Sequence, residues 1–387
     1  MECESVIYLD NAATTWPKPE SVAEAMKRCV AEYGANPGRG SYRLSRQAGE
    51  TVEKTRSLLA RLFRVDDPNN IFFCANGTHA INQALKGVLN PGDHVITTCW
   101  EHNAVTRPLE ILRKEVGIAV THVPAGKEGT VDLAEVEKAV RPETRMILST
   151  HASNVTGAVL PIESLGRVAR KNGVWFLVDA AQTAGVLDID VQQMGIDLLA
   201  FPGHKGLFGP QGTGGLYVNP EIPMVPVFQG GTGIRSESVE QPFDRPTGFE
   251  SGTVNTPGIA GLGAGIQFLQ ETGIERIHRH EMKVAERLRE GLKEIPGVTL
   301  YPSHSVTLPL ISFNMEGLDG NEAAVILDQH YDIAVRAGFH CAAVAHRTLQ
   351  TEVFGTIRVS PGYFNTLQEA EAFLEAVREI GEAFAGV

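Results

Sequence analysis

From about residue 70 onward, short and almost continuously apolar runs alternate with longer stretches in which apolar positions recur at helical spacing. This alternation is typical of βα units, and the continuous apolar character of the runs predicts strands buried on both faces of a mostly parallel sheet. The predicted strands are centred on residues 71–73, 94–96, 146–148, 174–178 and 198–201. The predicted helices between them cover residues 80–88, 104–116 and 162–171, and Gly173 closes the last of these.

The second part of the chain has a different pattern. Residues 220–257 are rich in Gly, Pro and Ser and have little periodicity, which predicts a linker or a functional loop. Helices are predicted from Pro257 to about residue 270, over 274–293 and 322–329, and from Leu367 onward; strands are predicted at 298–301, 310–314, 333–336 and 356–359. This part therefore reads as a separate α+β unit.

A chain of 387 residues is too long for one ordinary core. We predict an α/β fold with a large domain over residues 20–258 and a smaller α+β domain over 259–387. The first residues, 1–19, are expected to pack on the smaller domain.

Composition narrows the class of protein. Apolar residues make up 43% of the chain and charged residues 21%, which is typical of a soluble globular protein. The formal net charge of −12 and the lack of a basic block disfavour nucleic acid as a partner. The start has no signal-peptide pattern and no stretch is long enough to cross a bilayer, so we expect a cytoplasmic protein that is not in a membrane.

The chain has five scattered cysteines, and no C-x-x-C pair suggests a metal site. We predict that Cys3, Cys29, Cys74, Cys99 and Cys341 are reduced thiols. We expect no metal in the site.

Polar residues follow each predicted strand of the large domain. In an open parallel sheet, ligands bind at the carboxyl ends of the strands, so these residues are expected to meet at one edge. In chain order they are Asn76-Gly77-Thr78, Glu101-His102-Asn103, His151-Ala152-Ser153-Asn154, Asp179-Ala180-Ala181-Gln182 and Gly203-His204-Lys205.

Three of these groups suggest a particular chemistry, and each has a plainer alternative. Gly77 and Thr78 at a helix N-terminus could seat a phosphate, or Thr78 could simply cap the helix. Asp179 could pair with a protonated ring nitrogen, or cap a following helix. Lys205 could form a Schiff base if burial lowers its pKa, or it could be a solvated surface lysine.

Three further residues each have a functional and a purely structural interpretation. His102 could lie over a planar cofactor or be a structural histidine. Arg358 could bind a carboxylate or form a surface ion pair, and Cys341 could be a nucleophile or a small buried apolar residue. No G-x-G-x-x-G or Walker A pattern supports a nicotinamide or ATP site.

Together these residues resemble the class V aminotransferase-like family of fold-type I pyridoxal-phosphate enzymes, and within it the SufS-like cysteine desulfurases. The resemblance spans nearly the whole chain. It rests on residues 8–15 (YLDNAATT), 178–183 (VDAAQT), 203–205 (GHK) with 208–210 (FGP), 249–253 (FESGT) and 335–342 (VRAGFHCA). It implies a large domain with a mostly parallel sheet of the seven-stranded type, beside a smaller C-terminal domain that carries the catalytic cysteine.

The resemblance also implies a role for each residue. Lys205 would hold pyridoxal phosphate as a Schiff base, with His204 near the phosphate, Asp179 on the ring nitrogen, Gln182 on the phenolic oxygen and His102 over the ring. Gly77 and Thr78 match phosphate contacts. Asn154, Arg358 and Asn11 are assigned to substrate binding, and Asn154 to cofactor binding as well. Thr253 matches a residue that reaches the neighbouring subunit's phosphate, which implies a homodimer.

The implied activity converts L-cysteine to L-alanine and leaves a persulfide on Cys341, for an acceptor of the SufE or SufU type in iron–sulfur cluster assembly. Three positions depart from the family pattern: Pro202 stands where a serine is common, Tyr42 where a histidine is frequent, and Phe339 in place of the first histidine of a pair. The alternatives that remain open are a selenocysteine lyase, another lyase, aminotransferase or epimerase without a mobile thiol, and a silent scaffold.

Overall fold

The structure is a computed structural model that describes residues 6–38, 40–126, 130–301 and 307–384. Its elements follow this order along the chain: β1 (Ile7–Tyr8), α1 (Glu20–Glu32), α2 (Arg43–Phe63), η1 (Pro68–Asn70), β2 (Ile71–Cys74), α3 (Gly77–Val88), β3 (His94–Thr98), α4 (Asn103–Glu115), β4 (Ala119–Val123), α5 (Leu133–Ala139), β5 (Thr144–Thr150), α6 (Ile162–Asn172), β6 (Trp175–Asp179), β7 (Leu198–Pro202), β8 (Gly214–Val218), η2 (Thr247–Phe249), α7 (Thr256–Thr272), α8 (Ile274–Lys293), β9 (Val298–Tyr301), β10 (Ile311–Met315), α9 (Gly320–Tyr331), β11 (Ile333–Ala334), β12 (Arg336–Gly338), α10 (Ala343–Leu349), β13 (Thr356–Val359) and α11 (Leu367–Phe384).

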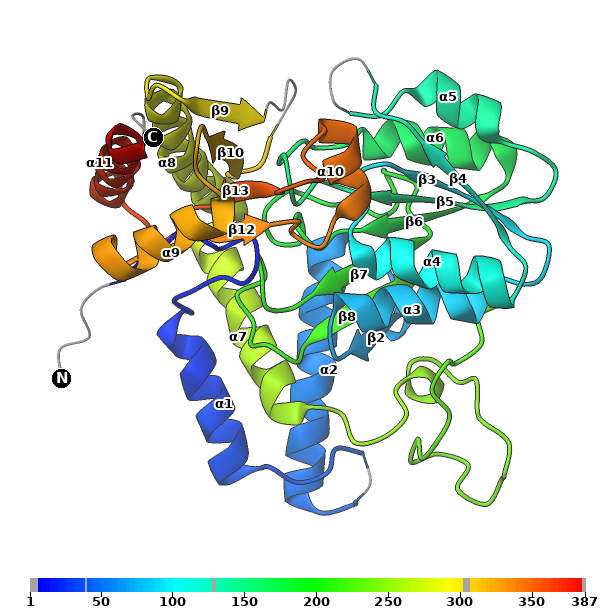
Figure 1. Cartoon of the computed structure of the whole chain (residues 1–387). Helices are drawn as coiled ribbons and strands as arrows, with labels where there is room; N and C mark the ends of the chain where they lie inside the picture. Colours follow the sequence, from blue (N-terminus) through cyan, green and yellow to red (C-terminus); the bar gives the residue numbers. More distant parts are fainter. Residues whose placement is uncertain (1–5, 39, 127–129, 302–306, 385–387) are drawn as a thin grey trace.

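The large sheet has seven strands in the order β2-β8-β7-β6-β5-β3-β4 (Figure 1). The strands from β4 to β7 pair in parallel, and β8 is antiparallel to both of its neighbours. Because two antiparallel steps separate β2 from β7, these strands run the same way and end at the same edge. The mostly parallel sheet predicted from the sequence is therefore confirmed, and β2 delivers its residues to the same edge as the parallel strands.

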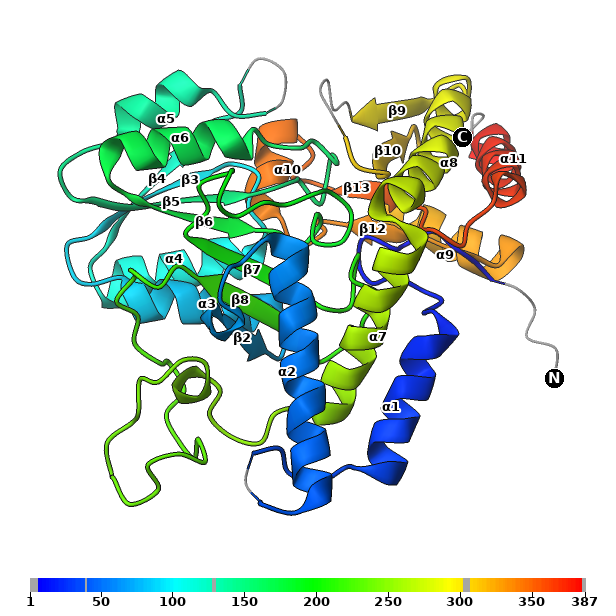
Figure 2. The same ribbon diagram turned by 180° about the vertical axis from the view of Figure 1, so that it is seen from behind.

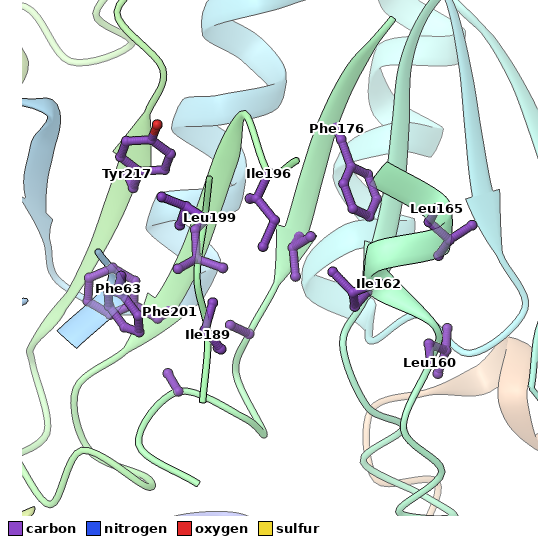
Figure 3. Close-up of a cluster of buried hydrophobic side chains, with 14 of the residues drawn as sticks. Phe63, Leu160, Ile162, Leu165, Phe176, Ile189, Ile196, Leu199, Phe201 and Tyr217 are labelled. Atoms are coloured by element: carbon purple, nitrogen blue, oxygen red, sulfur yellow. The ribbon is translucent and has the colours of Figure 1, made fainter. Parts of the chain in front are cut away.

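Helices cover both faces of this sheet. Successive side chains of a strand point to opposite faces, so neighbouring strand residues pack against different helices. In β6, Phe176 and Val178 belong to one apolar cluster and Leu177 to another. The first cluster includes buried residues of α2, α6 and α7, and the second includes those of α3 and α4. Figure 3 shows part of the first cluster, where Phe176, Leu199, Phe201 and Tyr217 of the strands lie near Phe63 of α2 and Ile162 and Leu165 of α6.

The smaller sheet is antiparallel, with the order β12-β13-β10-β9, and packs with α8, α9 and α11 around a third apolar cluster. The start of the chain joins this part, since β1 pairs in parallel with β11 and Asp10 bridges to Ser360. By contrast, α10 turns toward the large sheet, because Ala342 and Ala345 are buried in the first cluster. The segment that carries Cys341 therefore connects the two sheets.

Helix α7 packs against both α1 and α2, and the lower parts of these helices extend below the two sheets in both views (Figures 1 and 2). Between β8 and α7 the chain makes the long excursion at the lower right of Figure 1, and the short η2 is the one helix that the structure assigns within it. This agrees with the irregular segment predicted over residues 220–257.

One predicted element is wrong. The strand expected over residues 333–336 is two strands in different sheets: β11 pairs with β1, whereas β12 pairs with β13. The sequence prediction also left out β1, α1, α2, β4, α5, β8 and α10.

Cys29, Cys74 and Cys99 are buried free thiols and Cys341 is a partly exposed one. Cys3 lies outside the described residues. In the part of the chain that the structure covers, no helix combines the length and the apolar character needed to cross a bilayer.

Candidate active site

A cavity of about 220 Å³ lies at the carboxyl edge of the large sheet. Its wall combines residues that follow five strands of this sheet with two arginines of the smaller sheet, Arg336 and Arg358. Among the residues predicted for the site, those that line the cavity are Gly77, Thr78, His102, Asn154, Asp179, Gln182, His204, Lys205 and Arg358. Cys341, Asn11 and Thr253 lie outside its lining.

Lys205 lies just past the end of β7, in the turn Gly203–Gly206, with its side chain on the cavity wall. Within the described chain, its amine makes no hydrogen bond and no ion pair. Burial and the charges of Arg358 and Arg336 lower the pKa of Lys205 to about 8, although Asp179 acts in the opposite direction. A substantial fraction of this amine is therefore neutral and nucleophilic near physiological pH.

Asp179 is the last residue of β6 and is almost fully buried. Its Oδ1 accepts a hydrogen bond from the Ala181 N–H at 2.9 Å. Turns, not a helix, follow this residue, so the alternative that Asp179 caps a helix is wrong. Burial raises the pKa of Asp179, and the nearby Lys205 charge opposes that rise. A cationic group in the cavity would stabilise the charged form of this carboxylate.

His102 is the N-cap residue of α4, and its Nδ1 accepts the Ala104 N–H at 2.9 Å. Burial and the charges of Lys205, Arg336, Arg358 and Arg107 lower the pKa of His102 to about 4. The ring is therefore neutral at physiological pH, and because Nδ1 is an acceptor, the proton is on Nε2. His102 is thus both a structural cap and a cavity residue, so the two interpretations of the sequence are compatible.

The end of the cavity beside α3 presents a helix N-terminus. The N-cap residue is Asn76, whose side chain accepts the His79 N–H at 2.8 Å, so the prediction that Thr78 caps this helix is wrong. Gly77 and Thr78 occupy the first turn, where backbone N–H groups lack helical partners and favour an anion. Pro202, at the end of β7, lines the same region and offers neither a hydroxyl nor an N–H.

Two further predicted cofactor contacts line the cavity and are linked to the N-terminal segment. Gln182 donates from Nε2 to the Ala12 carbonyl at 3.1 Å. His204 Nδ1 lies 3.1 Å from the Thr14 hydroxyl, and burial with nearby lysines lowers the pKa of His204 to about 4. His204 is therefore neutral and its ring is fixed in place.

Arg358 is almost fully buried and is held by two oxygens. Its Nη2 is 2.7 Å from Asp10 Oδ1, and its Nη1 donates to the Asn154 carbonyl at 2.9 Å. Its Nε is buried without a hydrogen-bond partner in the described structure. An unpaired buried donor is costly, and because Arg358 also lines the cavity, its guanidinium is suited to an anionic ligand. Asp10 belongs to the 8–15 motif, but the sequence reasoning gave it no role.

Asn154, whose carbonyl accepts the hydrogen bond from Arg358, also lines the cavity. Its side-chain amide donates to the His340 carbonyl at 2.7 Å. Asn154 therefore holds the segment that precedes Cys341 as well as lining the cavity.

Cys341 lies beside the cavity, and Arg336 connects the two. Arg336 Nη2 is 3.5 Å from Cys341 Sγ. The Cys341 carbonyl accepts the Asn103 N–H at 2.7 Å, immediately after His102. His340 and Cys341 both have left-handed backbone φ angles, 46° and 57°, which are uncommon for residues other than glycine and occur often at functional sites.

Asn11 and Thr253 are placed elsewhere. The Asn11 amide donates to the carbonyls of Tyr8 and Ser360 and to the Asn365 side chain, and it accepts the Trp16 N–H. The side chain of Asn11 thus links the N-terminal segment to the smaller sheet. Thr253 is exposed, accepts a hydrogen bond from Asn36 at 3.2 Å, and lines a separate cavity of about 250 Å³.

The known proteins that are similar to this chain belong to the family that the sequence motifs indicate. The sequence profile of the family described as Aminotransferase class-V matches residues 7–373. A protein named probable cysteine desulfurase from Methanothermobacter thermautotrophicus is 38% identical over 97% of this chain and 94% of its own, and one from Pyrococcus abyssi is 36% identical with the same coverage. The solved apo structure of a cysteine desulfurase from Thermococcus onnurineus has a TM-score of 0.92 and 35% identity, and covers 98% of this chain and 95% of that one.

Proposed function

This chain belongs to the class-V aminotransferase family, and we propose that it is a pyridoxal-phosphate-dependent cysteine desulfurase. The reaction converts L-cysteine to L-alanine and leaves the substrate sulfur on Cys341 as a persulfide. The observation that carries the proposal is the composition of one cavity. It holds a lysine amine and an arginine Nε that have no partner among the described residues, together with a buried carboxylate, and it lies beside a partly exposed cysteine.

The residues of the cavity fit pyridoxal phosphate. The free amine of Lys205 suits the aldehyde, the buried carboxylate of Asp179 suits a protonated ring nitrogen, and the first turn of α3 suits the phosphate. His102, Gln182 and His204 complete the wall around the ring. Pro202 removes one hydroxyl from the phosphate end, so the helix N–H groups and His204 have a larger share of that contact.

Bound there, pyridoxal phosphate would supply an electrophilic carbon and an electron sink for the pair left when the substrate Cα–H bond breaks. The remaining steps are carried out by side chains of the protein. The Arg358 guanidinium would bind the substrate carboxylate, and the Lys205 amine, with a pKa of about 8, would accept the Cα proton at Nζ. The negative charge of Asp179 would keep the ring nitrogen protonated.

Sulfur transfer requires a nucleophile that can reach the substrate. The Cys341 thiolate attacks the substrate sulfur, the new S–S bond forms as the C–S bond breaks, and the electron pair stays on the carbon product. Protonation of that product gives L-alanine, and the neutral His102 can deliver a proton from Nε2. The sum is L-cysteine plus the Cys341 thiol giving L-alanine plus the Cys341 persulfide.

The proposal includes partners. We propose a homodimer in which Thr253, exposed in the single chain, faces the neighbouring subunit's cavity. We also propose a protein acceptor of the SufE or SufU type for the persulfide sulfur, and a cytoplasmic location.

The experiment supplies L-cysteine and a thiol reductant to protein loaded with pyridoxal phosphate, and measures alanine and sulfide. Borohydride reduction followed by peptide mass spectrometry identifies the lysine that carries the cofactor. We expect equimolar alanine and sulfide with the label on Lys205, and neither product with Lys205→Ala. Labelling of another lysine, or pyruvate with ammonia in place of alanine, would contradict the proposal.

A further inference from the structure

Among the charged residues that line the cavity in the described structure, Arg336 is the one that the proposed mechanism leaves without a role. It lies on β12, directly opposite Arg358 of β13 in the antiparallel register. Like charges at directly opposed positions destabilise a sheet. Arg358 has Asp10 as its counter-ion, whereas Arg336 makes no ion pair with any residue in the described part of the chain. Positions that break a local rule in this way are often functional.

The charge of Arg336 acts throughout the cavity. It helps to lower the pKa values of His102, Lys205 and His340. An anion bound beside Arg336 would relieve this unfavourable charge. In the structure, the nearest acceptor that Arg336 contacts is Cys341 Sγ, at 3.5 Å from Nη2.

The backbone around Cys341 fixes where its sulfur lies. The Asn103 N–H holds the Cys341 carbonyl, and the Asn154 amide holds the carbonyl of His340. The His340 ring is anchored in turn, because its Nε2 lies 2.9 Å from the Thr356 carbonyl and 3.0 Å from the Thr356 hydroxyl. These contacts hold the backbone of the two consecutive left-handed residues, and from this backbone Sγ lies beside the Arg336 guanidinium.

We propose that Arg336 is a positioning residue for the transferred sulfur, and that its guanidinium holds the terminal sulfur of the Cys341 persulfide in the cavity. A persulfide is a stronger acid than a thiol, so its terminal sulfur is an anion at neutral pH, and it extends one bond further than Sγ. A guanidinium donates charge-assisted hydrogen bonds to such an anion. No bond is made or broken by Arg336. This inference rests on the proposed function, which places the persulfide on Cys341.

The test measures persulfide stability in cofactor-free protein, so it needs no turnover. Sodium tetrasulfide is equilibrated with the protein at pH 7: the Cys341 thiolate and tetrasulfide give the Cys341 persulfide and trisulfide. Peptide mass spectrometry then gives the persulfidated fraction of Cys341. Removal of a hydrogen bond to a charged group should lower the equilibrium constant about tenfold in Arg336→Met, with partial recovery in Arg336→Lys. Arg107→Met is the control, because its charge reaches His102 but it has no contact with Cys341 Sγ.

A second measurement separates this role from carboxylate binding. L-alanine has the carboxylate of the substrate but no sulfur, so Arg336→Met should change the affinity of the loaded enzyme for L-alanine less than about twofold. An unchanged persulfidation equilibrium in Arg336→Met would overturn the inference, as would a large loss of L-alanine affinity with normal persulfidation. Failure of the proposed function would appear differently, as wild-type protein that forms no alanine from L-cysteine.

Discussion

Replacing Lys205 by methionine should stabilise the cofactor-free protein. The side chain is partly buried in the cavity wall, near the charges of Arg358 and Arg336, and its amine has no hydrogen-bond partner among the described residues. Folding therefore places a positive charge where loss of hydration and nearby cations disfavour it. Methionine keeps the length of the side chain and removes the charge. A lysine retained at such a cost is expected at a catalytic position.

The magnitude follows from the pKa of Lys205, which falls from the ordinary value of 10.5 to about 8. At 1.36 kcal/mol per pH unit, this corresponds to about 3 kcal/mol against folding. Because the folded pKa is the lower one, the penalty is fully present below about pH 8 and disappears as the pH rises toward 10.5. At pH 9.5 about 1 kcal/mol should remain. Loss of the lysine charge beside Asp179 offsets part of the gain.

The assay is urea unfolding of the cofactor-free wild type and Lys205→Met at pH 7 and pH 9.5. The stability advantage of the variant should narrow by about 2 kcal/mol between these two values. Lys18→Met is the matched control, because burial lowers the pKa of Lys18 to about 8 as well. The Lys18 amine, however, donates to the Thr15 hydroxyl and the His204 carbonyl, so its removal should give no gain at pH 7. An advantage of Lys205→Met that does not change with pH would refute the reasoning.

Three further predictions concern ion pairs and the phosphate end of the cavity. Asp10→Ala leaves the buried Arg358 without its counter-ion, so it should lower stability by about 3 kcal/mol in urea unfolding and weaken L-alanine binding to the loaded enzyme. Glu250→Gln breaks the buried two-point contact with Arg56, so it should lower stability by a similar amount of about 3 kcal/mol without changing L-alanine affinity; equal loss of affinity would contradict the separation of these sites. Pro202→Ser adds a hydroxyl to the cavity wall, so equilibrium dialysis should show about threefold tighter binding of pyridoxal phosphate, and weaker binding would count against the assigned phosphate position.

Most strands and helices after residue 70 could be predicted from the sequence, because their runs have one dominant period and a clear terminator, whereas β4, α5, β8 and α10 were missed. Helix α8 was predicted with its observed limits, since apolar residues recur on one face from Ile274 to Lys293. The strand at 333–336 was not, because β11 and β12 are contiguous in sequence and are separated only by their partners, β1 and β13. Pairing with strands elsewhere in the chain, such as β11 with β1 at its start, leaves no local sequence pattern.

Some residues of the candidate site could likewise be predicted from the sequence, and others could not. Asp179 and Lys205 were predictable because strand ends of one direction meet at one edge of a sheet. The contacts of Asp10 with Arg358 and of Arg336 with Cys341 were not, since both depend on how the smaller sheet sits beside the cavity. The carboxylate of Asp10 and the guanidinium of Arg336 are ordinary surface groups until tertiary structure buries or pairs them.

The most direct test of the central claim compares the wild type with Cys341→Ser, both loaded with pyridoxal phosphate and supplied with L-cysteine or L-selenocysteine. Alanine, sulfide or selenide, and sulfane sulfur on residue 341 are measured, while the cofactor absorbance band confirms that both proteins are loaded. The account predicts that Cys341→Ser keeps the band but forms neither alanine nor sulfide from L-cysteine, and that the wild type carries the sulfane sulfur on Cys341. Normal turnover of L-cysteine by Cys341→Ser would contradict it and show that another group receives the sulfur.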